Sequence, residues 1–264
     1  MIEVQDLTVI FNPKTPIERV ALTDVSLHLE SGEFVSVIGS NGAGKSTLLS
    51  AIAGDVLPTR GQVVLSNVNV TRFPAERRAL FVARVFQDPL AGSCGNMTVA
   101  ENLALALSRG HKRGLWPALR RKNLKTLTER ISELGTGLEN RLGQPMGSLS
   151  GGQRQSLSLV MATLAPSSIL LLDEHTAALD PQNAEFVLNL TRQLAEKFNL
   201  TVLMVTHSMR QALEFGSRTI MLHGGRIILD VKDPERRTLG IEDLLQMFKK
   251  ARGEELSEDR LLAG

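Results

Sequence analysis

One stretch of the sequence has the composition of a phosphate-binding loop, G-x-x-x-x-G-K-[ST]. Glycines let successive backbone N–H groups face phosphate oxygens, and a following helix adds the positive end of its dipole. Lys45 then reaches the β- and γ-phosphates of a nucleotide, and the Ser46 hydroxyl binds Mg²⁺. A glycine turn with a solvated lysine is the alternative. The predicted nucleotide-binding residues are Gly39, Ser40, Asn41, Gly42, Ala43, Gly44, Lys45, Ser46 and Thr47.

Two adjacent carboxylates, Asp173 and Glu174, follow the apolar run of residues 169–172. At the carboxyl edge of a strand beside a nucleotide, Asp173 can hold Mg²⁺ through water, and Glu174 can orient or deprotonate the attacking water. Taken alone, the pair is equally typical of an ordinary polar strand end. Together with the phosphate loop, it predicts the second half of a site that hydrolyses a nucleoside triphosphate.

A second helix start led by glycines comprises Ser150, Gly151, Gly152 and Gln153. Apolar residues follow at positions 157, 160, 161 and 164, which is the spacing of one helix face. Helix N-termini bind anions through free N–H groups and the helix dipole. Because the first loop already accounts for the phosphates of one nucleotide, this surface predicts contact with a nucleotide held by another subunit.

The elements around these residues alternate between strand and helix. Buried-strand patterns cover residues 34–38, 169–172 and 202–206, whereas residues 48–54 and 187–198 have helical periodicity. A β-α-β order predicts a mainly parallel sheet.

Three further segments complete the outline. Between residues 88 and 150 the strand signal fades and helical periodicity replaces it, which indicates a helical insert. Residues 219–229 have the pattern of a hairpin. From residue 232 the chain is polar and is expected to be helical with a frayed end.

Composition and charge narrow the class of protein. The chain has 264 residues, 42% hydrophobic and 22% charged, which excludes a fibre or a mainly disordered chain. Its 30 Lys and Arg against 28 Asp and Glu give a net charge of +2, too balanced for bulk attraction to nucleic acid or anionic lipid. The single cysteine, Cys94, and the lack of signal-peptide and membrane-span patterns predict a cytoplasmic location.

In this order the motifs resemble those of the nucleotide-binding subunits of ATP-binding cassette (ABC) transporters. The resemblance covers essentially the whole length, and its most specific part is residues 149–153, which are similar to the family's signature motif. The order also fits, because Gln87 follows the phosphate loop, and Asp180 and His207 follow the carboxylate pair.

The resemblance implies a role for each of these residues. Gln87 resembles the Q-loop glutamine, which contacts Mg²⁺ and the attacking water and links the catalytic core to the helical insert. Asp180 resembles the D-loop aspartate of the dimer interface, and His207 resembles the switch histidine that contacts the γ-phosphate. Subunits of this family stack head to tail, so that Ser150, Gly151 and Gly152 of one close over ATP on the other. The implied catalytic residues are Glu174, His207 and Gln87, and the implied metal ligands are Ser46, Gln87 and Asp173.

The family's fold is that of an α/β P-loop NTPase: a RecA-like, mainly parallel sheet, an antiparallel β subdomain and an α-helical subdomain. Residues 1–264 are expected to form a single ABC ATPase domain. Within it, we expect the catalytic core and β subdomain at residues 1–87 and 161–235, the helical subdomain at 88–160 and a C-terminal tail at 236–264.

Two positions depart from the family pattern. Adenine usually stacks there on an aromatic residue upstream of the phosphate loop, and Phe11 is the candidate because the chain has no Tyr. Core packing is the alternative for Phe11, and residues 12–19 form a longer segment than usual. His175 stands where the family usually has Pro, and we expect it to be a surface variation without a catalytic role.

Two surface regions follow Gln87 in the sequence. In the family, the first of them receives the coupling helices of the membrane subunits, and the small residues within 89–109 would allow such a groove. Cys94 is expected to be a passive small residue, not a redox site. A basic stretch then surrounds Trp116, and we expect a solvated helical face because acidic residues follow it, with contact to anionic lipid as the alternative. The stretch contains Arg109, Lys112, Arg113, Arg120, Arg121, Lys122 and Lys125.

These features predict an ATPase that uses ATP and Mg²⁺, forms a homodimer or pseudo-dimer and energises transport through a separate membrane permease. The sequence around residues 86–92 and 173–181 resembles a bacterial group of uptake systems for amino acids, tryptophan and tyrosine among them. That group implies an extracytoplasmic solute-binding protein and a peripheral position on the inner face of the cell membrane.

Two other classes stay open. A soluble ABC ATPase acting on nucleic acid or ribosomes usually carries two cassettes or a long coiled-coil insert, whereas this chain has one phosphate loop and a short insert, so no nucleic acid is expected. A nucleotide-dependent structural module without hydrolysis is disfavoured because Glu174 and His207 are both present.

Overall fold

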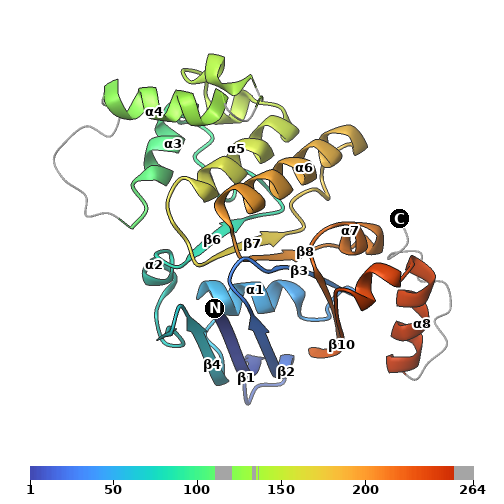
Figure 1. The fold of residues 1–264 in the computed structure, drawn as a ribbon. Helices are drawn as coiled ribbons and strands as arrows, with labels where there is room; N and C mark the ends of the chain where they lie inside the picture. Colours follow the sequence, from blue (N-terminus) through green and yellow to red (C-terminus); the bar gives the residue numbers. More distant parts are fainter. Residues whose placement is uncertain (111–120, 133–134, 136, 253–264) are drawn as a thin grey trace.

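The computed structural model describes residues 1–110, 121–132, 135 and 137–252. Two β-sheets and a group of helices lie in layers (Figure 1). Within the described ranges, none of the helices combines the length and apolar character needed to traverse a bilayer.

The central sheet has six strands. In spatial order they are β10 (Arg226–Lys232), β9 (Arg218–His223), β3 (Phe34–Gly39), β8 (Val202–Val205), β7 (Ile169–Asp173) and β6 (Val82–Val85). The last five are parallel to one another, and β10 pairs antiparallel with β9 at one edge. This confirms the predicted parallel sheet and hairpin, and it brings the carboxyl ends of β3, β6, β7 and β8 to one edge.

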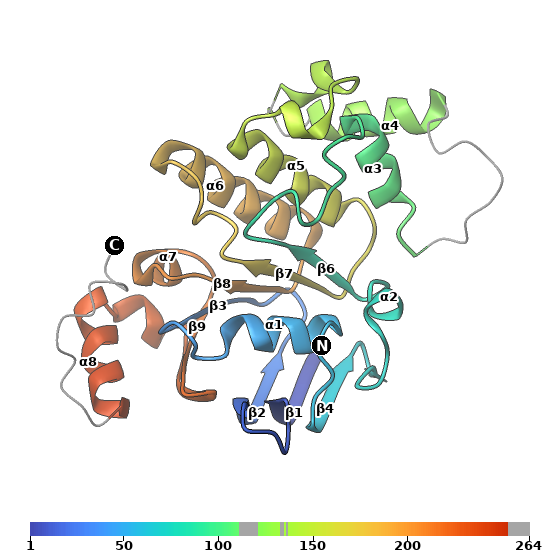
Figure 2. The same ribbon diagram turned by 180° about the vertical axis from the view of Figure 1, so that it is seen from behind.

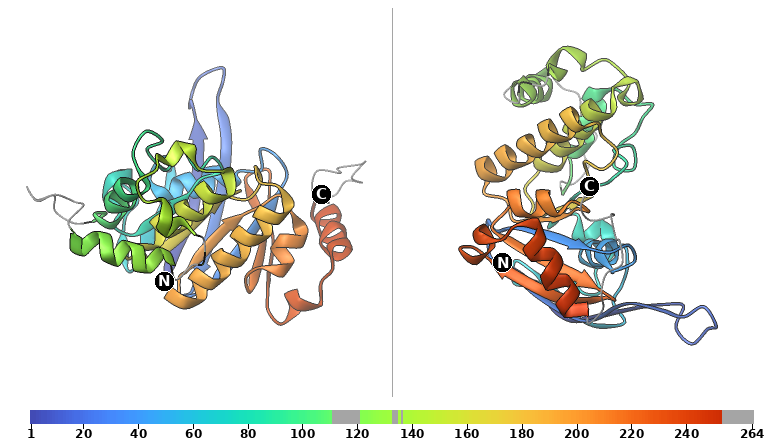
Figure 3. Two further views of the ribbon diagram at one scale, coloured as in Figure 1. Left: turned by 90° about the horizontal axis from the view of Figure 1, so that it is seen from above. Right: turned by 90° about the vertical axis from the view of Figure 1, so that its right-hand side faces the viewer.

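A second, antiparallel sheet lies below the central one in Figure 1. In spatial order its strands are β2 (Arg19–Leu29), β1 (Ile2–Phe11), β4 (Arg60–Leu65) and β5 (Val68–Asn69). Helix α1 (Lys45–Ala53) lies between the two sheets, and its apolar residues share one core with both (Figure 2). The turn between β1 and β2 projects from the body of the molecule (Figure 3).

Helices cover the other face of the central sheet. Helices α5 (Gly151–Thr163) and α6 (Pro181–Phe198) pack their buried apolar residues on it (Figures 1 and 2). Beyond α5, a separate apolar cluster joins α3 (Val99–Leu107), α4 (Arg121–Ser132) and the short 3₁₀ turns η1 (Leu138–Arg141) and η2 (Met146–Ser148). The predicted change from strands to helices beyond residue 88 is thus observed.

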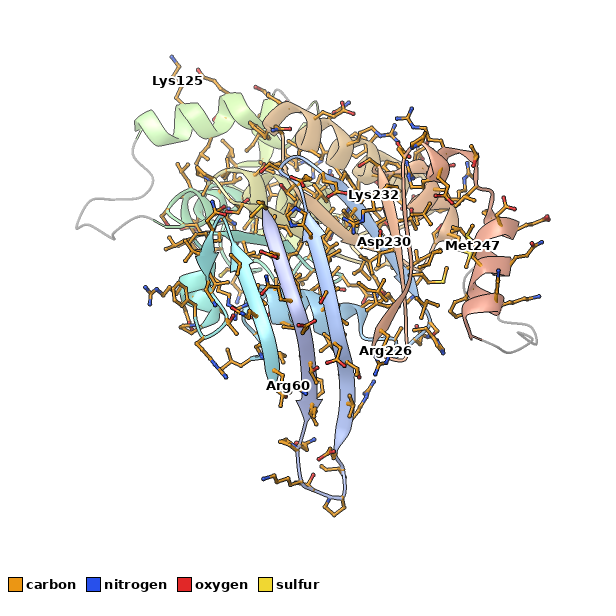
Figure 4. The ribbon with its side chains drawn as sticks, turned by 60° about the horizontal axis from the view of Figure 1, so that its bottom comes forward. Arg60, Lys125, Arg226, Asp230, Lys232 and Met247 are labelled. Atoms are coloured by element: carbon orange, nitrogen blue, oxygen red, sulfur yellow. The ribbon has the colours of Figure 1, made fainter. Side chains whose placement is uncertain are left out.

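The C-terminal part packs on the hairpin edge of the central sheet. Helix α8 (Ile241–Arg252) buries Leu244 and Phe248 in a cluster shared with α7 (Met209–Glu214) and β9. Figure 4 shows α8, with Met247, beside β10, with Arg226 and Asp230. The segment is helical as expected, but its polar residues occupy one face only. The remaining short elements are α2 (Ala75–Arg78) and η3 (Glu235–Thr238).

Three arginine side chains satisfy carbonyl groups at helix C-termini. Arg78 donates to carbonyls of α1, Arg109 to carbonyls at the end of α5, and Arg236 to carbonyls of α7. A cation at this end also opposes the negative end of the helix dipole. For Arg109 this corrects the prediction of a solvated face, because its side chain is turned inward onto α5.

The rest of the basic stretch is only partly described. Lys125 is 81% exposed, lies 3.9 Å from Glu129 on α4, and points away from the body of the molecule in Figure 4, as a solvated face requires. The side chains of Arg121 and Lys122 lie outside the described part of α4. Outside the described residues lie Lys112, Arg113, Trp116, Arg120 and the end of the predicted tail.

Candidate functional site

The predicted phosphate loop connects β3 to α1 at the carboxyl edge of the central sheet. Gly44 precedes α1 with φ 102°, and a Cβ there would lie 2.7 Å from the Ala21 carbonyl oxygen, so this position requires glycine. Among the described residues, no side chain caps the first N–H groups of α1. Those N–H groups are therefore available to an anion.

Lys45 lies inside this loop. Its Nζ donates hydrogen bonds to the carbonyl oxygens of Gly39 at 2.7 Å and Ser40 at 3.1 Å. Burial lowers the pKa of Lys45, and the nearby charges of Glu174 and Asp173 oppose that effect. A partly desolvated ammonium in a loop of N–H groups is a strong partner for phosphate oxygens.

Asp173 divides its two oxygens between different partners. Its Oδ1 accepts a hydrogen bond from Ser46 Oγ at 3.2 Å, and its Oδ2 accepts one from Arg84 Nη2 at 2.7 Å. The described residues contain no group of three or more His, Cys, Asp and Glu that would hold a metal by themselves. Mg²⁺ is commonly bound by one or two carboxylates together with nucleotide phosphates. Ser46 Oγ and Asp173 Oδ1 therefore fit Mg²⁺ that arrives with a nucleotide.

Glu174 faces His207 across the ends of β7 and β8. Glu174 Oε1 lies 2.6 Å from His207 Nε2. The backbone of Glu174 has φ 48°, and its N–H donates to the Val205 carbonyl oxygen at 3.0 Å. This sharp turn directs the carboxylate out of the strand to the edge where α1 begins. A carboxylate held there can orient or deprotonate a water molecule.

One pocket of about 340 Å³ joins residues 41–47 of the loop with Glu174, His207 and Arg19. Sequence reasoning missed Arg19. Arg19 Nη2 lies 3.6 Å from the position of a Cβ built on Gly42. The β1–β2 register, which sets Arg19 opposite Phe11, is the signal that identifies it.

Phe11 ends β1 beside this pocket without lining it. The residue is 36% exposed, so core packing does not explain it. Directly opposite residues of an antiparallel pair place their side chains on the same face of the sheet. Phe11 and Arg19 therefore form one face of the hairpin at the pocket's edge.

Gln87 is the one predicted catalytic residue that stands apart. It is exposed in the bend after β6, and it is not among the described residues that line the pocket. Because β6 pairs with β7, Gln87 follows the strand next to the one that carries Asp173.

The second glycine-led surface is the N-terminus of α5. Ser150 Oγ accepts from the Gln153 N–H at 3.3 Å, and Gln153 Oε1 accepts from the Ser150 N–H at 3.1 Å. A Cβ on Gly152 would lie 2.5 Å from Asn183 Oδ1, so glycine permits the close approach of α5 and α6. Asp180 caps α6 by accepting from the Asn183 N–H at 3.1 Å.

Residues 150–153 and Asp180 thus gather on one face, here named the signature face. None of these described residues lines the pocket of the phosphate loop. Instead, Gly152, Gln153 and Asn183 line a separate hollow. The predicted nucleotide-binding residues therefore fall into two groups within one chain.

His175 is buried, so the prediction of a surface variation is wrong. The residue is 2% exposed, and its Nε2 lies 3.1 Å from Thr191 Oγ1 on α6. Thr191 Oγ1 donates its proton to the Val187 carbonyl oxygen at 2.8 Å, so it accepts from His175 Nε2–H. Burial also lowers the pKa of His175 to about 4, which keeps the ring neutral. The side chain turns inward because the chain after Glu174 packs against α6.

A larger hollow of about 660 Å³, here named the α3–α5 groove, lies between β6, α3 and α5. Arg84, Phe86, Cys94 and Leu105 contribute to its lining. Asn102 fixes one wall, because its Oδ1 accepts from the Cys94 N–H at 2.8 Å and its Nδ2 donates to the Cys94 carbonyl at 3.0 Å. Cys94 itself is an exposed free thiol.

Comparison with known proteins identifies close relatives. A family model described as ABC transporter matches residues 22–177. The chain is 46% identical over 253 residues to a tyrosine transport ATP-binding protein of Clostridioides difficile (strain R20291), which covers 95% of this chain and 100% of that relative. It is 36% identical over 210 residues to the thiamine import ATP-binding protein ThiQ of Escherichia coli (strain UTI89 / UPEC), with coverage of 80% and 85%.

Solved structures agree. The ATP-binding cassette MJ0796, bound to ADP and Pi as a post-hydrolysis dimer, matches with a TM-score of 0.73 and 30% identity, over 88% of this chain and 98% of that chain. A second dimeric structure of MJ0796, a bacterial ABC transporter cassette, matches with a TM-score of 0.74 and 29% identity over the same shares. The predicted P-loop NTPase fold is therefore confirmed, and the chain belongs to the ABC transporter family as an ATP-hydrolysing subunit.

Proposed function

We propose that this chain hydrolyses ATP to drive the import of a small solute, an aromatic amino acid, through a separate membrane permease. The observation that carries the proposal is the 46% identity to a tyrosine transport ATP-binding protein along the whole of that relative. The thiamine import relative supports import as the direction. An extracytoplasmic solute-binding protein would deliver the solute, and this chain would lie on the inner face of the membrane.

In this proposal the loop residues 39–47 bind the phosphates of ATP, with Lys45 at the β- and γ-phosphates. Ser46 and Asp173 would hold Mg²⁺, which would supply positive charge to stabilise the phosphates. Glu174 orients and deprotonates the attacking water, and the Glu174–His207 contact at 2.6 Å places the histidine for the γ-phosphate. Gln87 would join these groups when the two chains close.

The exposed face of the β1–β2 hairpin is the proposed adenine side of the site. Phe11 stacks on the base, and Arg19 contributes a cation beside the phosphates. The cross-strand pairing of the two residues supports this assignment.

The signature face is proposed to act on the nucleotide of a second copy. In a head-to-tail dimer, residues 150–153 of one chain would close over ATP in the pocket of the other, with Asp180 at the interface. The separation of the two groups of residues within one chain supports this arrangement. The dimer relatives of known structure are consistent with it.

The α3–α5 groove is the proposed binding site for the permease. It is lined by residues from both β6 and the helical layer, so an occupant would contact the part of the chain that also carries Gln87. We assign residues 1–87 and 161–235 to the catalytic core with its β subdomain, 88–160 to the helical subdomain and 236–264 to the tail.

Capture of the partner tests the transport function. Tagged Glu174→Gln protein should retain ATP without turnover, and with ATP it should recover a multi-span permease from detergent-solubilised membranes, identified by mass spectrometry. Lys45→Ala is the matched control, since it loses the phosphate contact and should recover much less. Recovery of only soluble complexes or nucleic acid by Glu174→Gln would contradict transport and favour a soluble mechanical ATPase.

The substrate class needs a separate measurement. Cells that depend on this chain should take up labelled tyrosine or tryptophan, and Glu174→Gln should abolish that uptake. Uptake of labelled thiamine in the same cells serves as the comparison. Loss of thiamine uptake with unchanged aromatic amino-acid uptake would contradict the proposed substrate class.

A further inference from the structure

We infer that Arg84 is a positioning residue that orients Asp173 toward Mg²⁺ and connects the metal site to the α3–α5 groove. The inference rests on the proposed function, because it concerns the metal and the groove assigned there. None of the motifs in the sequence includes Arg84, which lies on β6 three residues before Gln87.

The contacts of Arg84 determine how Asp173 is held. Arg84 Nη2 donates to Asp173 Oδ2 at 2.7 Å, and Nη1 donates to Asp55 Oδ2 at 2.6 Å. Asp173 Oδ2 is thereby occupied, and Oδ1 is turned to Ser46 Oγ. Partners of this kind orient metal-binding carboxylates, and their loss typically weakens metal binding or activity about 10–100-fold.

The charges around Asp173 are compatible with a metal ion. A lone guanidinium next to a Mg²⁺ site would repel the ion. Asp55 pairs with the same guanidinium, and Lys45 and Glu174 lie near Asp173, so three carboxylates and two cations leave the cluster negative. Only 13% of the Arg84 side chain and 14% of that of Asp173 are exposed, so solvent screens this pair weakly. Arg84 therefore fixes the geometry of Asp173 without removing its attraction for a cation.

Arg84 also reaches the groove. It lines the groove together with Phe86, and its Cζ lies 4.7 Å from the centroid of the Phe86 ring. Its Nε is buried and has no hydrogen-bond partner within the described ranges, so the guanidinium is held from its two Nη atoms. A helix bound in the groove would contact the Phe86 ring. Movement of the ring would then shift the Arg84 guanidinium, which holds Asp173.

The competing explanation is that Arg84 has only a structural role, in which it links β6 to the end of α1. Such a role would depend mainly on the ion pair with Asp55, which directly follows the C-terminal cap of α1. In that case Asp55→Asn and Arg84→Met would lower the melting temperature alike, and neither would alter the response to Mg²⁺ specifically.

The test is the Mg²⁺ dependence of nucleotide binding by the purified full chain. A fluorescent ATP analogue is titrated in EDTA and at increasing Mg²⁺, for the wild type and for Arg84→Met, Arg84→Lys and Asp55→Asn. Arg84→Met should raise the half-saturating Mg²⁺ concentration about tenfold or more, with affinity in EDTA within about twofold of the wild type. Arg84→Lys keeps the charge but not the two-point geometry, so it should show an intermediate rise. It also serves if Arg84→Met does not fold.

Two further variants test the link between the metal site and the α3–α5 groove. Phe86→Leu removes the contact with the guanidinium and should shift the Mg²⁺ response in the same direction by about threefold. Leu105→Ser changes the groove wall on α3, a different element from the one that carries Arg84, and should leave the response unchanged.

Each outcome has a distinct meaning. If folded Arg84→Met and Arg84→Lys respond to Mg²⁺ as the wild type does, or bind it more tightly, the inference is overturned and the proposed function stands. If Phe86→Leu behaves as Leu105→Ser does, the link to the groove is overturned. If the wild type itself shows no Mg²⁺-dependent nucleotide binding, the proposed function fails, and this inference fails with it.

Discussion

The N-termini of α1 and α5 both follow glycine-containing segments, yet the two helices differ in whether side chains cap their first N–H groups. Gly44 precedes α1 and supplies no side-chain cap, whereas Ser150 and Gln153 form a reciprocal capping box at α5. The start of α1 lies in a pocket with Lys45 and Glu174, and the start of α5 lies on the signature face.

This difference indicates which half of the site is completed by a ligand within one chain and which is completed by a second chain. The N-terminus of α1 has no side-chain cap, and in the proposed site the phosphates of a nucleotide would satisfy its N–H groups within one chain. At α5 the capping box satisfies the N–H groups of Ser150 and Gln153 and stabilises the exposed end, while the first N–H groups of the helix stay available for contact with another chain. Variants that affect one half and not the other test this separation.

The largest effect is expected from Glu174→Gln, which changes the pocket only. Replacing the proposed base should reduce the rate of phosphate release by about 10²–10⁴-fold, while nucleotide affinity is retained. Phosphate release and ATP-dependent dimerisation by size-exclusion chromatography measure the two properties. Turnover close to that of the wild type would show that Glu174 is not the base.

A smaller effect is expected from Gly152→Ala, which changes the signature face only. The added Cβ would clash with Asn183 and shift α5 against α6, at a cost of about 1–3 kcal/mol. Hydrolysis by the dimer should fall about tenfold or more. Affinity of the monomer for the nucleotide should stay within about twofold, because Gly152 lies outside the pocket.

Asn183→Ala provides the matched control for that prediction. Combined with Gly152→Ala, it removes Oδ1 and Cγ of Asn183, which the new Cβ would meet at 2.5 and 2.7 Å, and should restore part of the lost activity. Loss of nucleotide affinity in the monomer of Gly152→Ala would contradict the separation of the two halves.

His175 follows the pocket residue Glu174 and contacts Thr191 of α6. Replacement of His175 should change the pH dependence of stability. Burial lowers its pKa from 6.5 to about 4, so the unfolded chain binds a proton that the folded chain does not bind between these values. Stability should therefore fall as pH drops from 6.5 to about 4, by a total on the order of 3 kcal/mol from this group. His175→Gln should remove that part of the slope in chemical denaturation.

Thr191→Val is the control for His175. It removes the hydrogen-bond acceptor and should destabilise the fold by about 1–3 kcal/mol, but it keeps the titrating ring and hence the pH slope. An unchanged slope in His175→Gln would mean that the ring is not the group that titrates.

The smallest effect is expected from Lys125→Ala on the exposed side of α4. Its pair with Glu129 is exposed, and such pairs contribute about 0–1 kcal/mol. The melting temperature should change very little. A large decrease would contradict the interpretation of a solvated face at this position.

Features encoded in consecutive residues were predictable from the sequence. The phosphate loop, the strand that ends at Asp173 and the helix that starts after Ser150 each depend on local glycines and periodicity. Their order along the chain then indicated the family and its mainly parallel sheet.

Features set by distant neighbours were not predictable in the same way. Arg19 reaches the pocket through the register of a hairpin, and Arg84 reaches Asp173 across two paired strands. His175 is buried because of α6, and Arg109 turns inward because α5 ends beside it. In each case the residue type allowed several environments, and tertiary packing selected one.

The most direct test of a site divided between two chains is complementation between two inactive variants. Lys45→Ala disables the pocket and Ser150→Arg disables the signature face, so each protein alone should lack ATPase activity. Mixing equal amounts should restore about a quarter of the wild-type activity, because half of the dimers are mixed and each then contains one intact composite site. A mixture no more active than its components, with mixed dimers shown to form, would contradict the account.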